Sequence, residues 1–524
     1  MKKNLSKLLS LALVAMLSLA MLVGCGNNNG GTNNENTENK PQQTSGEKRD
    51  DVIIATANEP PTLAPYQHSA VASTYINLLT HDNFLRTNVE TLEPEPGIIT
   101  KWDNITDTQW KFYIRDDVTF HNGEKMTSAD MVASMEYARE QQSYTSNYSN
   151  FWESIEIVDD YSFIVNTKDV YAKTLNDMAS HRVLPKSLLD SGNDFNTNPI
   201  GTGPYKFVSQ TLGDNIVLEA YDEYWGGAPS IKHMTWRIIP EGSSRTIALE
   251  AGEVDFIVEV ETNDLARLEE EDGITVVNKT GTSFNFMTLN TEKYPFDNQD
   301  FRHALNCAIN KDALVQVALN GAGTGNSNQT PVIFEGHSER NVDTYDIELA
   351  KQYLEKSGID PTTITFSCIC SDDVKRRCAE VIQSNLQELG ITMNIESMDL
   401  ATYLSAAAEG NFEATIGGCT TANTLGFIEY KFHSKQIGGS NFTRTNDPKI
   451  DELWDKAAKT LDDTERLAIL EECAAYINEL CPHVPTYQVN VVRAYNSNLQ
   501  GFEVNASGNT YWQYVSWADR KSVV

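Results

Sequence analysis

Apolar and polar residues alternate along several short stretches of the chain, and this alternation predicts β-strands. Every second residue is apolar in 110–114 and again in 364–370. Side chains of a strand point in turn to its two faces, so a period of two is typical of a strand with one buried face. A similar strand at 205–209, a Gly-Asp-Asn turn and an apolar run at 216–220 together predict a hairpin. A second hairpin is predicted over 155–165.

Apolar residues spaced three and four apart predict helices between these strands. A stripe from Met131 to Ala138 follows residues 127–130, which have the spacing of an N-terminal capping box. Residues 364–395 alternate, then repeat at helical spacing up to Gly390, then alternate again. That order predicts a strand, a helix and a second strand parallel to the first, joined by a right-handed crossover.

The C-terminal half continues this mixture of helices and strands. One helix is predicted to start at Pro448, and another over 467–480 ends before Pro482. Residues 485–492 predict a return strand, whereas the proline-rich residues 92–101 predict a connection without regular structure. The chain as a whole is therefore predicted to be an α/β protein.

Length and charge limit the kinds of function that fit this pattern. A chain of 524 residues is too long for one ordinary core and predicts two or three domains. Its net charge of -32 argues against binding nucleic acid, because no basic stripe is available to displace counterions from phosphates. The same acidity argues against adhesion of the folded part to anionic lipid.

The N-terminus has the pattern of an export signal. Three lysines precede the apolar run 8–23, which ends just before Cys25. Residues 1–25 are therefore predicted to be a signal peptide, and the segment resembles a bacterial lipobox, which implies a lipid on Cys25. An ordinary secreted protein and a retained anchor helix are the alternatives. Residues 26–50 are rich in Asn, Thr and Gly and predict a disordered tether.

Enzyme motifs are missing from the sequence. It has no nucleophile elbow, no His-Glu-x-x-His and no phosphate-binding loop, and the glycine-rich residues 321–325 follow a helix and predict a connector. The nine histidines show no ligand spacing, so no metal site and no cofactor are predicted. Among the seven cysteines after Cys25, a thiolate site at Cys368, Cys370 and Cys378 is conceivable, but burial as small apolar side chains is the favoured interpretation.

Four ordered signatures resemble one protein family. They are the stretch 59–65, the block from Trp110 to Ala138, the block 201–255 that opens with Gly-Thr-Gly-Pro-Tyr, and the strand and helix pair at 284–321. This order resembles the family 5 solute-binding proteins of bacterial ABC importers, a group of dipeptide, oligopeptide and nickel binders. The resemblance extends over residues 52–517, nearly the whole mature chain.

The resemblance implies a two-lobed fold of the periplasmic-binding-protein type, class II, with an added subdomain. The first lobe is expected to consist of 51–82, 200–291 and 491–524, with an extra α+β subdomain at 83–199. The second lobe is expected at 292–490, with a hinge near its start.

The implied function is that of a transport component and not of an enzyme. The chain is expected to act as a monomer that captures a small solute, a peptide above all, between its lobes. It would deliver the solute to ABC permease and ATPase subunits at the outer face of the cytoplasmic membrane, held there by the lipid on Cys25. Alternatives are an oligosaccharide or a nickel chelate as the solute, a secreted hydrolase, or a chemosensory receptor subunit.

The ligand-binding residues are predicted on both lobes. Peptide-binding members use a Trp-x-x-Asp-Tyr-like stretch in the second lobe, but the corresponding residues 418–423 contain neither Trp nor Asp. Thr420, Thr421 and Asn423 would suit a neutral ligand or a peptide backbone. If the alignment shifts by several residues, Glu413 or Glu429 would supply the carboxylate. Tyr66 and Trp512 are expected to stack on the ligand, and packing within the core of the first lobe is the competing interpretation for each.

Overall fold

The computed structural model describes residues 49–68, 70–141 and 150–518. The predicted signal peptide, Cys25 and nearly all of the predicted tether lie outside these residues. Within the described part of the chain, no helix is both long enough and apolar enough to cross a membrane.

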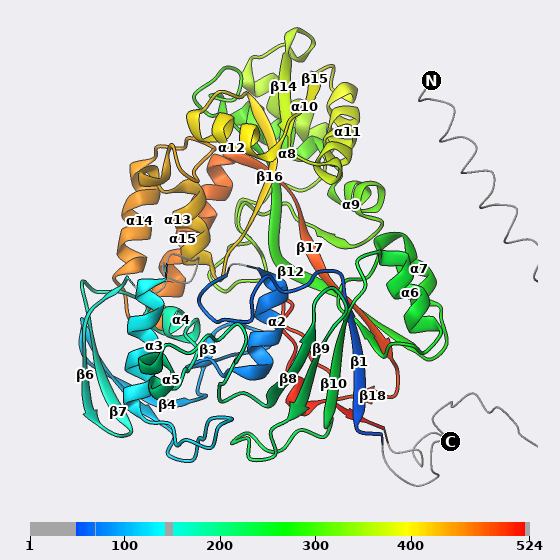
Figure 1. The fold of residues 1–524 in the computed structure, drawn as a ribbon. Helices are drawn as coiled ribbons and strands as arrows, with labels where there is room; N and C mark the ends of the chain where they lie inside the picture. Colours follow the sequence, from blue (N-terminus) through cyan, green and yellow to red (C-terminus); the bar gives the residue numbers. More distant parts are fainter. Residues whose placement is uncertain (1–48, 69, 142–149, 519–524) are drawn as a thin grey trace, which may run out of the picture. The chain divides into compact units, whose positions relative to one another are not determined.

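The main sheet runs through the whole body and joins its two lobes (Figure 1). Its order is β15-β14-β16-β12-β17-β11-β1-β10-β9-β8, with β13 paired to β17. Two long antiparallel strands, β12 (Ile274–Leu289) and β17 (His483–Asn496), contribute to both lobes. At one end β12 pairs with second-lobe strand β16 (Ala414–Thr420), and at the other β17 pairs with first-lobe strand β11 (Phe256–Ile257). The predicted strands at 284–290 and 485–492 are therefore confirmed, but both extend much further than their apolar patterns.

The first lobe is built on β1 (Asp51–Thr56), which lies parallel to β10 (His233–Ile238). The predicted hairpin is confirmed as β8 (Tyr205–Thr211) and β9 (Asn215–Ala220). The helices of the first lobe are α2 (Val71–Thr80), α6 (Gly242–Glu250) and α7 (Leu265–Glu269). The C-terminal residues of the chain complete this core, because Trp512, Val515 and Trp517 pack with the first-lobe strands.

The glycines before β8 are required by a close approach of two backbone segments. A Cβ atom on Gly201 would lie 2.2 Å from the carbonyl oxygen of Thr80, and one on Gly203 would lie 2.4 Å from that of Leu79. Both oxygens belong to the end of α2. The turn at 201–205 therefore packs directly against the C-terminal end of α2.

A separate four-stranded antiparallel sheet, ordered β4-β5-β7-β6, forms between β1 and β8 in the sequence. The hairpin predicted over 155–165 is confirmed as β6 and β7, and the Thr127 capping box is present at the start of α3. The prediction for 92–101 was partly wrong, because β4 begins at Ile99 and pairs with β5. The elements are β2 (Arg86–Thr87), β3 (Pro94–Glu95), β4 (Ile99–Thr106), β5 (Gln109–Ile114), α3 (Ser128–Glu140), β6 (Trp152–Asp159), β7 (Ser162–Thr167), α4 (Thr174–Ala179) and α5 (Lys186–Ser191).

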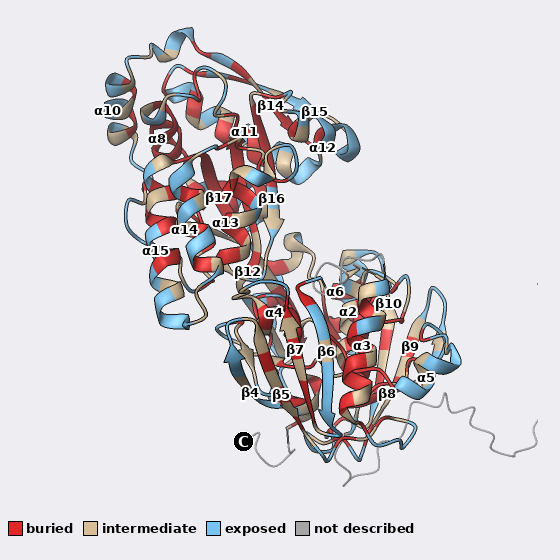
Figure 2. Cartoon of the chain, turned by 90° about the vertical axis from the view of Figure 1, so that its left-hand side faces the viewer, coloured by how far each residue is buried: buried red, intermediate tan, exposed pale blue. Residues whose placement is uncertain are grey.

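The second lobe contains the predicted strand–helix–strand unit. Strands β14 (Thr365–Cys370) and β15 (Thr392–Ser397) are parallel and flank α11 (Asp373–Glu388) in sequence. Figure 2 shows that its helices bury one face and expose the other, as α14 does with Ile450, Trp454 and Ala457 buried. The other helices are α8 (Gln299–Ala308), α9 (Lys311–Leu319), α10 (Ile347–Ser357), α12 (Leu400–Glu409), α13 (Thr424–Phe432), α14 (Pro448–Ala458) and α15 (Asp463–Leu480).

Two smaller predictions for this lobe have clear outcomes. The glycine-rich connector at 321–325 includes a short strand, β13 (Gly323–Gly325), which the sequence did not predict. Cys368, Cys370 and Cys378 are free and buried among the apolar residues of the largest core cluster. Within the described chain, ligand-type side chains converge at a different place, His303, Asp343 and Cys481, and not at these three thiols.

Candidate ligand-binding site between the lobes

A cavity of about 280 Å³ lies where the first lobe and the extra subdomain meet the second lobe. Its wall comes from α2 and the residues on either side of it, from the β2–β3 region, from α4 and the residues that follow it, and from the C-terminal segment at 507–509. Ala422 of the second lobe, just after β16, completes it. A smaller niche of about 50 Å³ adjoins it and shares Asn83, Thr87 and Asn509 with it. The larger cavity is lined by His68, Thr74, Asn83, Thr87, Leu92, Pro94, Asn176, Ala179, Ser180, Arg182, Ala422, Ser507 and Asn509.

Arg182 supplies the only formal charge among these lining residues. Its side chain is buried, with 7% of the residue exposed, and its Nε atom has no hydrogen-bond partner among the residues that the structure describes. No carboxylate of the described residues forms an ion pair with it. Burial lowers the pKa of the Arg182 guanidinium, which shows the energetic penalty of placing this charge away from water. A buried cation without a partner costs several kcal/mol, so an anion entering the cavity would be strongly favoured there (roughly 3–5 kcal/mol is typical of breaking such a pair).

Two unsatisfied acceptors line the same cavity. His68 Nε2 lies 2.8 Å from Asn77 Oδ1, while Asn77 Nδ2 donates to the carbonyl of Leu63. The hydrogen on His68 must therefore be on Nε2, which leaves the buried and unpaired Nδ1 as an acceptor. Burial lowers the pKa of His68, which keeps its ring neutral. Asn83 Oδ1 is likewise buried without a partner.

The cavity therefore offers one cation and two hydrogen-bond acceptors to a ligand. A carboxylate beside N–H or O–H donors is the complementary chemistry. One acid, Glu93, lies between the lining residues Leu92 and Pro94. Burial, and then the nearby Glu335 of the second lobe, raise the pKa of Glu93, while Arg466 opposes this change.

The predicted second-lobe residues lie on either side of Ala422. Thr420 is exposed at the end of β16, and the Thr421 hydroxyl is buried without a partner. Asn423 is the N-cap of α13 and accepts a hydrogen bond from the Gly426 amide at 2.8 Å. The predicted segment thus borders the cavity, although only Ala422 contributes to its wall.

Tyr66 lies behind the cavity wall and holds Arg182. Its hydroxyl donates to the Arg182 carbonyl oxygen at 2.5 Å and accepts a hydrogen bond from the Arg182 amide. The ring is 1% exposed and packs with Ala64, Ala138 and Leu184 in a small core cluster.

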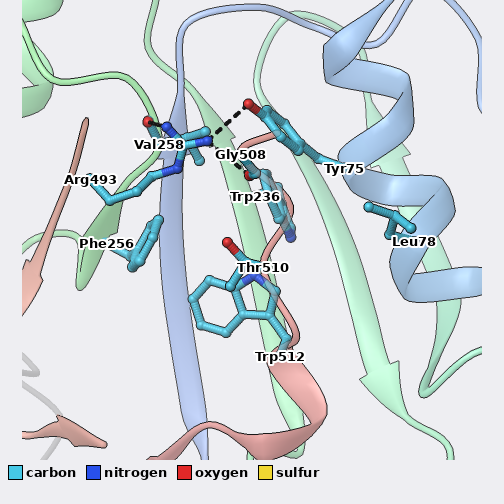
Figure 3. A pocket seen from close by; sticks show the side chains of 9 residues that line it. All are labelled: Tyr75, Leu78, Trp236, Phe256, Val258, Arg493, Gly508, Thr510 and Trp512. Carbon is cyan, nitrogen blue, oxygen red and sulfur yellow. Dashed lines mark hydrogen bonds between the residues drawn. The ribbon is translucent and has the colours of Figure 1, made fainter. Parts of the chain in front are cut away.

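Trp512 lines a different and much smaller cavity, of about 10 Å³, inside the first lobe (Figure 3). That volume is about enough for one water molecule. The ring lies edge-on to Phe256 at 5.1 Å between centroids. In the same cavity wall, Arg493 is fully engaged, because it donates to Val258, Gly508 and Tyr75. Neither Tyr66 nor Trp512 lines the 280 Å³ cavity.

Direct contacts already connect the extra subdomain with the second lobe. The Ala172 amide donates to the Ala458 carbonyl at 3.1 Å, and Lys173 Nζ lies 3.9 Å from Glu429 Oε2. Glu429, an alternative carboxylate from the sequence, is therefore committed to Lys173 and to Lys435, which lies at 3.2 Å. Glu413, the other alternative, accepts a hydrogen bond from the Ser367 amide at 2.7 Å.

Sequence reasoning missed Arg182, His68 and Asn83. No motif marks them, since Arg182 is one of many charged residues and its lack of a partner is visible only in three dimensions.

Comparison with known proteins identifies the family to which this chain belongs. The family model for bacterial extracellular solute-binding proteins, family 5, matches residues 93–439, and the chain belongs to this family. Members of the family are solute-binding components of ABC importers and not enzymes, as the sequence predicted.

Individual relatives agree with this assignment. The chain is 26% identical to heme-binding protein A of Haemophilus influenzae, over 75% of this chain and 78% of the relative. It is 24% identical to the dipeptide-binding protein of Escherichia coli, over 83% and 88% of the two chains. Among solved structures, HbpA2 from Haemophilus parasuis matches with a TM-score of 0.82 at 24% identity, covering 90% of this chain and all of that one. DppA from Helicobacter pylori, in complex with the peptide STSA, matches with a TM-score of 0.70 at 23% identity, covering 90% and 99%. The predicted two-lobed α/β fold is therefore confirmed.

Proposed function

We propose that this protein captures a small solute of the peptide class that carries a carboxylate, and presents it to a membrane permease. The unpaired, buried guanidinium of Arg182 in the cavity between the lobes carries this proposal. A ligand carboxylate on Arg182 would replace an unpaired charge with a charge-assisted, bidentate pair. Ligand N–H groups would satisfy His68 Nδ1 and Asn83 Oδ1, and an ammonium would lie beside Glu93.

This chemistry favours a charged solute over the neutral oligosaccharide that residues 418–423 had allowed. The dipeptide-binding relative and the STSA complex support the peptide class. A carboxylate-bearing nickel chelate is the second candidate, because it would use Arg182 in the same way.

Closure of the lobes would complete the site. Within the described residues, the long β12–β17 pair connects the two lobes through the sheet, so bending along these strands would change the distance between Ala422 and Arg182. The hydroxyls of Thr420 and Thr421 would then reach the ligand from the second lobe. The permease would bind the closed form.

Attachment through a lipid on Cys25, with residues 26–50 as a tether, belongs to the same proposal. The acidic lipid-free body has no membrane-spanning helix among its described residues, so the lipid would be its means of retention at the outer face of the cytoplasmic membrane. Replacement Cys25→Ser is expected to move the protein from the membrane fraction to the soluble fraction. Retention of the variant in the membrane would contradict the lipid anchor.

The ligand test compares matched peptides by calorimetry on the protein without residues 1–25. Di- and tripeptides with a free C-terminus are expected to bind, and the same peptides with an amidated C-terminus are expected to bind at least about tenfold more weakly, a loss of 1.4 kcal/mol. Arg182→Gln should abolish this preference. Arg340→Gln, which changes an exposed arginine outside the cavity, is the control. If free and amidated peptides bind equally well, or if Arg182→Gln keeps the preference, Arg182 does not bind the ligand carboxylate.

A further inference from the structure

A buried polar cluster in the second lobe lies apart from the ligand cavity. It contains His303 on α8, Asp343 in the loop before α10, and Cys481 directly after α15. All three are buried, and their ligand-type atoms lie within 4.8 Å of one another. The residues are distant in sequence, and the fold alone brings them together.

The hydrogen bonds of His303 leave two acceptor atoms facing each other. His303 Nε2 lies 2.8 Å from the carbonyl oxygen of Glu479, which can only accept, so Nε2 carries a hydrogen. His303 Nδ1 lies 2.7 Å from Asp343 Oδ2, and this oxygen also accepts from Asn306 Nδ2 at 3.1 Å. If the His303 ring is neutral and the Asp343 carboxylate is ionised, then Nδ1 and Oδ2 both carry lone pairs and no hydrogen lies between them, which is repulsive at this distance. A positive species, either an extra proton or a metal ion, must therefore lie between them.

The third group favours a metal ion as that species. The sulfur of Cys481 accepts a hydrogen bond from Gln329 Nε2 at 3.5 Å, and its thiol donates to the His483 carbonyl at 3.7 Å, a contact that a bound metal would replace. The Arg302 Nε atom donates to the Cys481 carbonyl at 2.9 Å. A thiolate, an imidazole nitrogen and a carboxylate oxygen are the donor types that Zn²⁺ uses in proteins. With metal–ligand bonds of about 2.0–2.3 Å, donors in a tetrahedral zinc site lie roughly 3.3–3.8 Å apart, so shifts of about 1 Å would suffice here.

The surroundings have the form of an outer ligand shell. A metal-bound histidine usually donates its second ring N–H to a carbonyl or carboxylate, as His303 does to Glu479. Asn306 and Gln329 orient the other two ligands. A second thiol, Cys307, is four residues after His303 on the same helix face and lies beside Asp343.

Two nearby cations, Arg302 and Lys311, oppose an added positive charge. Lys311 is buried, and its Nζ donates to the carbonyl and the side-chain oxygen of Asn306. Burial lowers the pKa of Lys311 to about 8, although the nearby Cys307, Cys481 and Asp343 oppose this change.

We propose that His303, Asp343 and Cys481 bind a divalent cation of the zinc type, with Cys307 or a water molecule as the fourth ligand. The ion replaces the proton shared by His303 and Asp343 and displaces the thiol proton of Cys481. It would connect α8, the loop before α10 and the end of α15, and so would stabilise the second lobe.

The test uses the purified protein after treatment with a chelator. Titration with Co²⁺ is expected to produce a near-ultraviolet thiolate-to-cobalt band and the strong visible bands of tetrahedral cobalt, at one ion per chain, and Zn²⁺ should remove them. Zn²⁺ should also raise the melting temperature of the second lobe. Cys481→Ser should abolish the thiolate band, and His303→Gln should weaken zinc binding by more than about tenfold. Cys473→Ser, a buried cysteine on α15 outside the cluster, is the matched control.

The outcomes separate an ion from a proton. If no thiolate band appears, or if it persists in Cys481→Ser, the metal site is overturned and the shared species is a proton. If Cys481→Ser fails to fold, the zinc affinity of His303→Gln and the zinc stoichiometry of the unmodified protein still decide between these results. Peptide binding at Arg182 is a separate measurement and does not depend on this outcome.

Discussion

The hydroxyl of Tyr66 is hydrogen-bonded to both the carbonyl oxygen and the amide of Arg182, with the carbonyl at 2.5 Å. A residue predicted to touch the ligand thus holds the backbone of the residue whose side chain lines the cavity. A substitution at Tyr66 can therefore lower ligand affinity by displacing Arg182, without Tyr66 itself touching the ligand.

Removing the Tyr66 hydroxyl is expected to affect both stability and ligand affinity. Tyr66→Phe leaves the Arg182 amide and carbonyl without this partner in a buried position, which should cost about 1–3 kcal/mol of unfolding free energy. Affinity for carboxylate ligands should fall with it, because Arg182 loses its fixed position. Denaturant unfolding and calorimetry measure the two effects. Tyr345→Phe, at an exposed tyrosine, should change neither, and an unaltered Tyr66→Phe protein would contradict this role.

Truncation of Trp512 is expected to lower stability without directly changing ligand affinity. The ring is 2% exposed and packs on Phe256 in the first-lobe core, so Trp512→Ala should cost about 3–5 kcal/mol. The milder Trp512→Phe should remain folded and bind ligand normally. If Trp512→Phe loses affinity while keeping its melting temperature, the ring contacts the ligand and the stacking expectation holds after all.

The turn at Gly203 should not accept a side chain. A Cβ atom would lie 2.4 Å from the Leu79 carbonyl oxygen and 2.6 Å from the His81 amide nitrogen, and both are backbone atoms at the end of α2. Gly203→Ala is therefore expected to cost more than about 2 kcal/mol. Gly439→Ala, where the nearest atom would be 3.3 Å away, should change stability far less. Equal melting temperatures for the two variants would show that α2 can move away from the turn.

Asp177 is expected to make stability depend on pH. Burial raises the pKa of Asp177 from 3.8 to about 7, and Glu429 adds to this, while Lys173 and the Tyr171 hydroxyl oppose it. The folded state therefore binds a proton that the unfolded state has released, so this contribution is present below pH 4 and is lost as the pH rises to about 7. It amounts to about 4 kcal/mol at most.

The variant Asp177→Asn mimics the protonated acid and tests this directly. It should match the unmodified protein near pH 4 and exceed it in unfolding free energy at pH 8, measured by denaturant titration. Asp190→Asn, at an exposed helix position, should show no such trend. A constant difference between Asp177→Asn and the unmodified protein across this range would mean that Asp177 is ionised in the folded state.

The local part of the fold could be predicted from sequence because its causes are local. Residues 127–130 specify a helix start, residues 201–205 a turn before a hairpin, and residues 364–395 a strand, a helix and a parallel strand. Each depends on side-chain periodicity or backbone geometry within a few residues. The full lengths of β12 and β17 could not be predicted in this way, because polar residues such as Lys279 and Arg493 show no strand pattern of their own and are held in these strands by pairing with the neighbouring strand.

The sequence by itself determined the family, the two-lobed α/β class and the export signal pattern, since short ordered motifs and apolar periodicity carry that information. Only the tertiary structure decided which side chains line the space between the lobes. Arg182 is distinguished by the absence of a partner within the described residues, and His303, Asp343 and Cys481 by their convergence from three separate segments. Burial and distance between remote residues decide such sites, and neither is encoded in any local pattern.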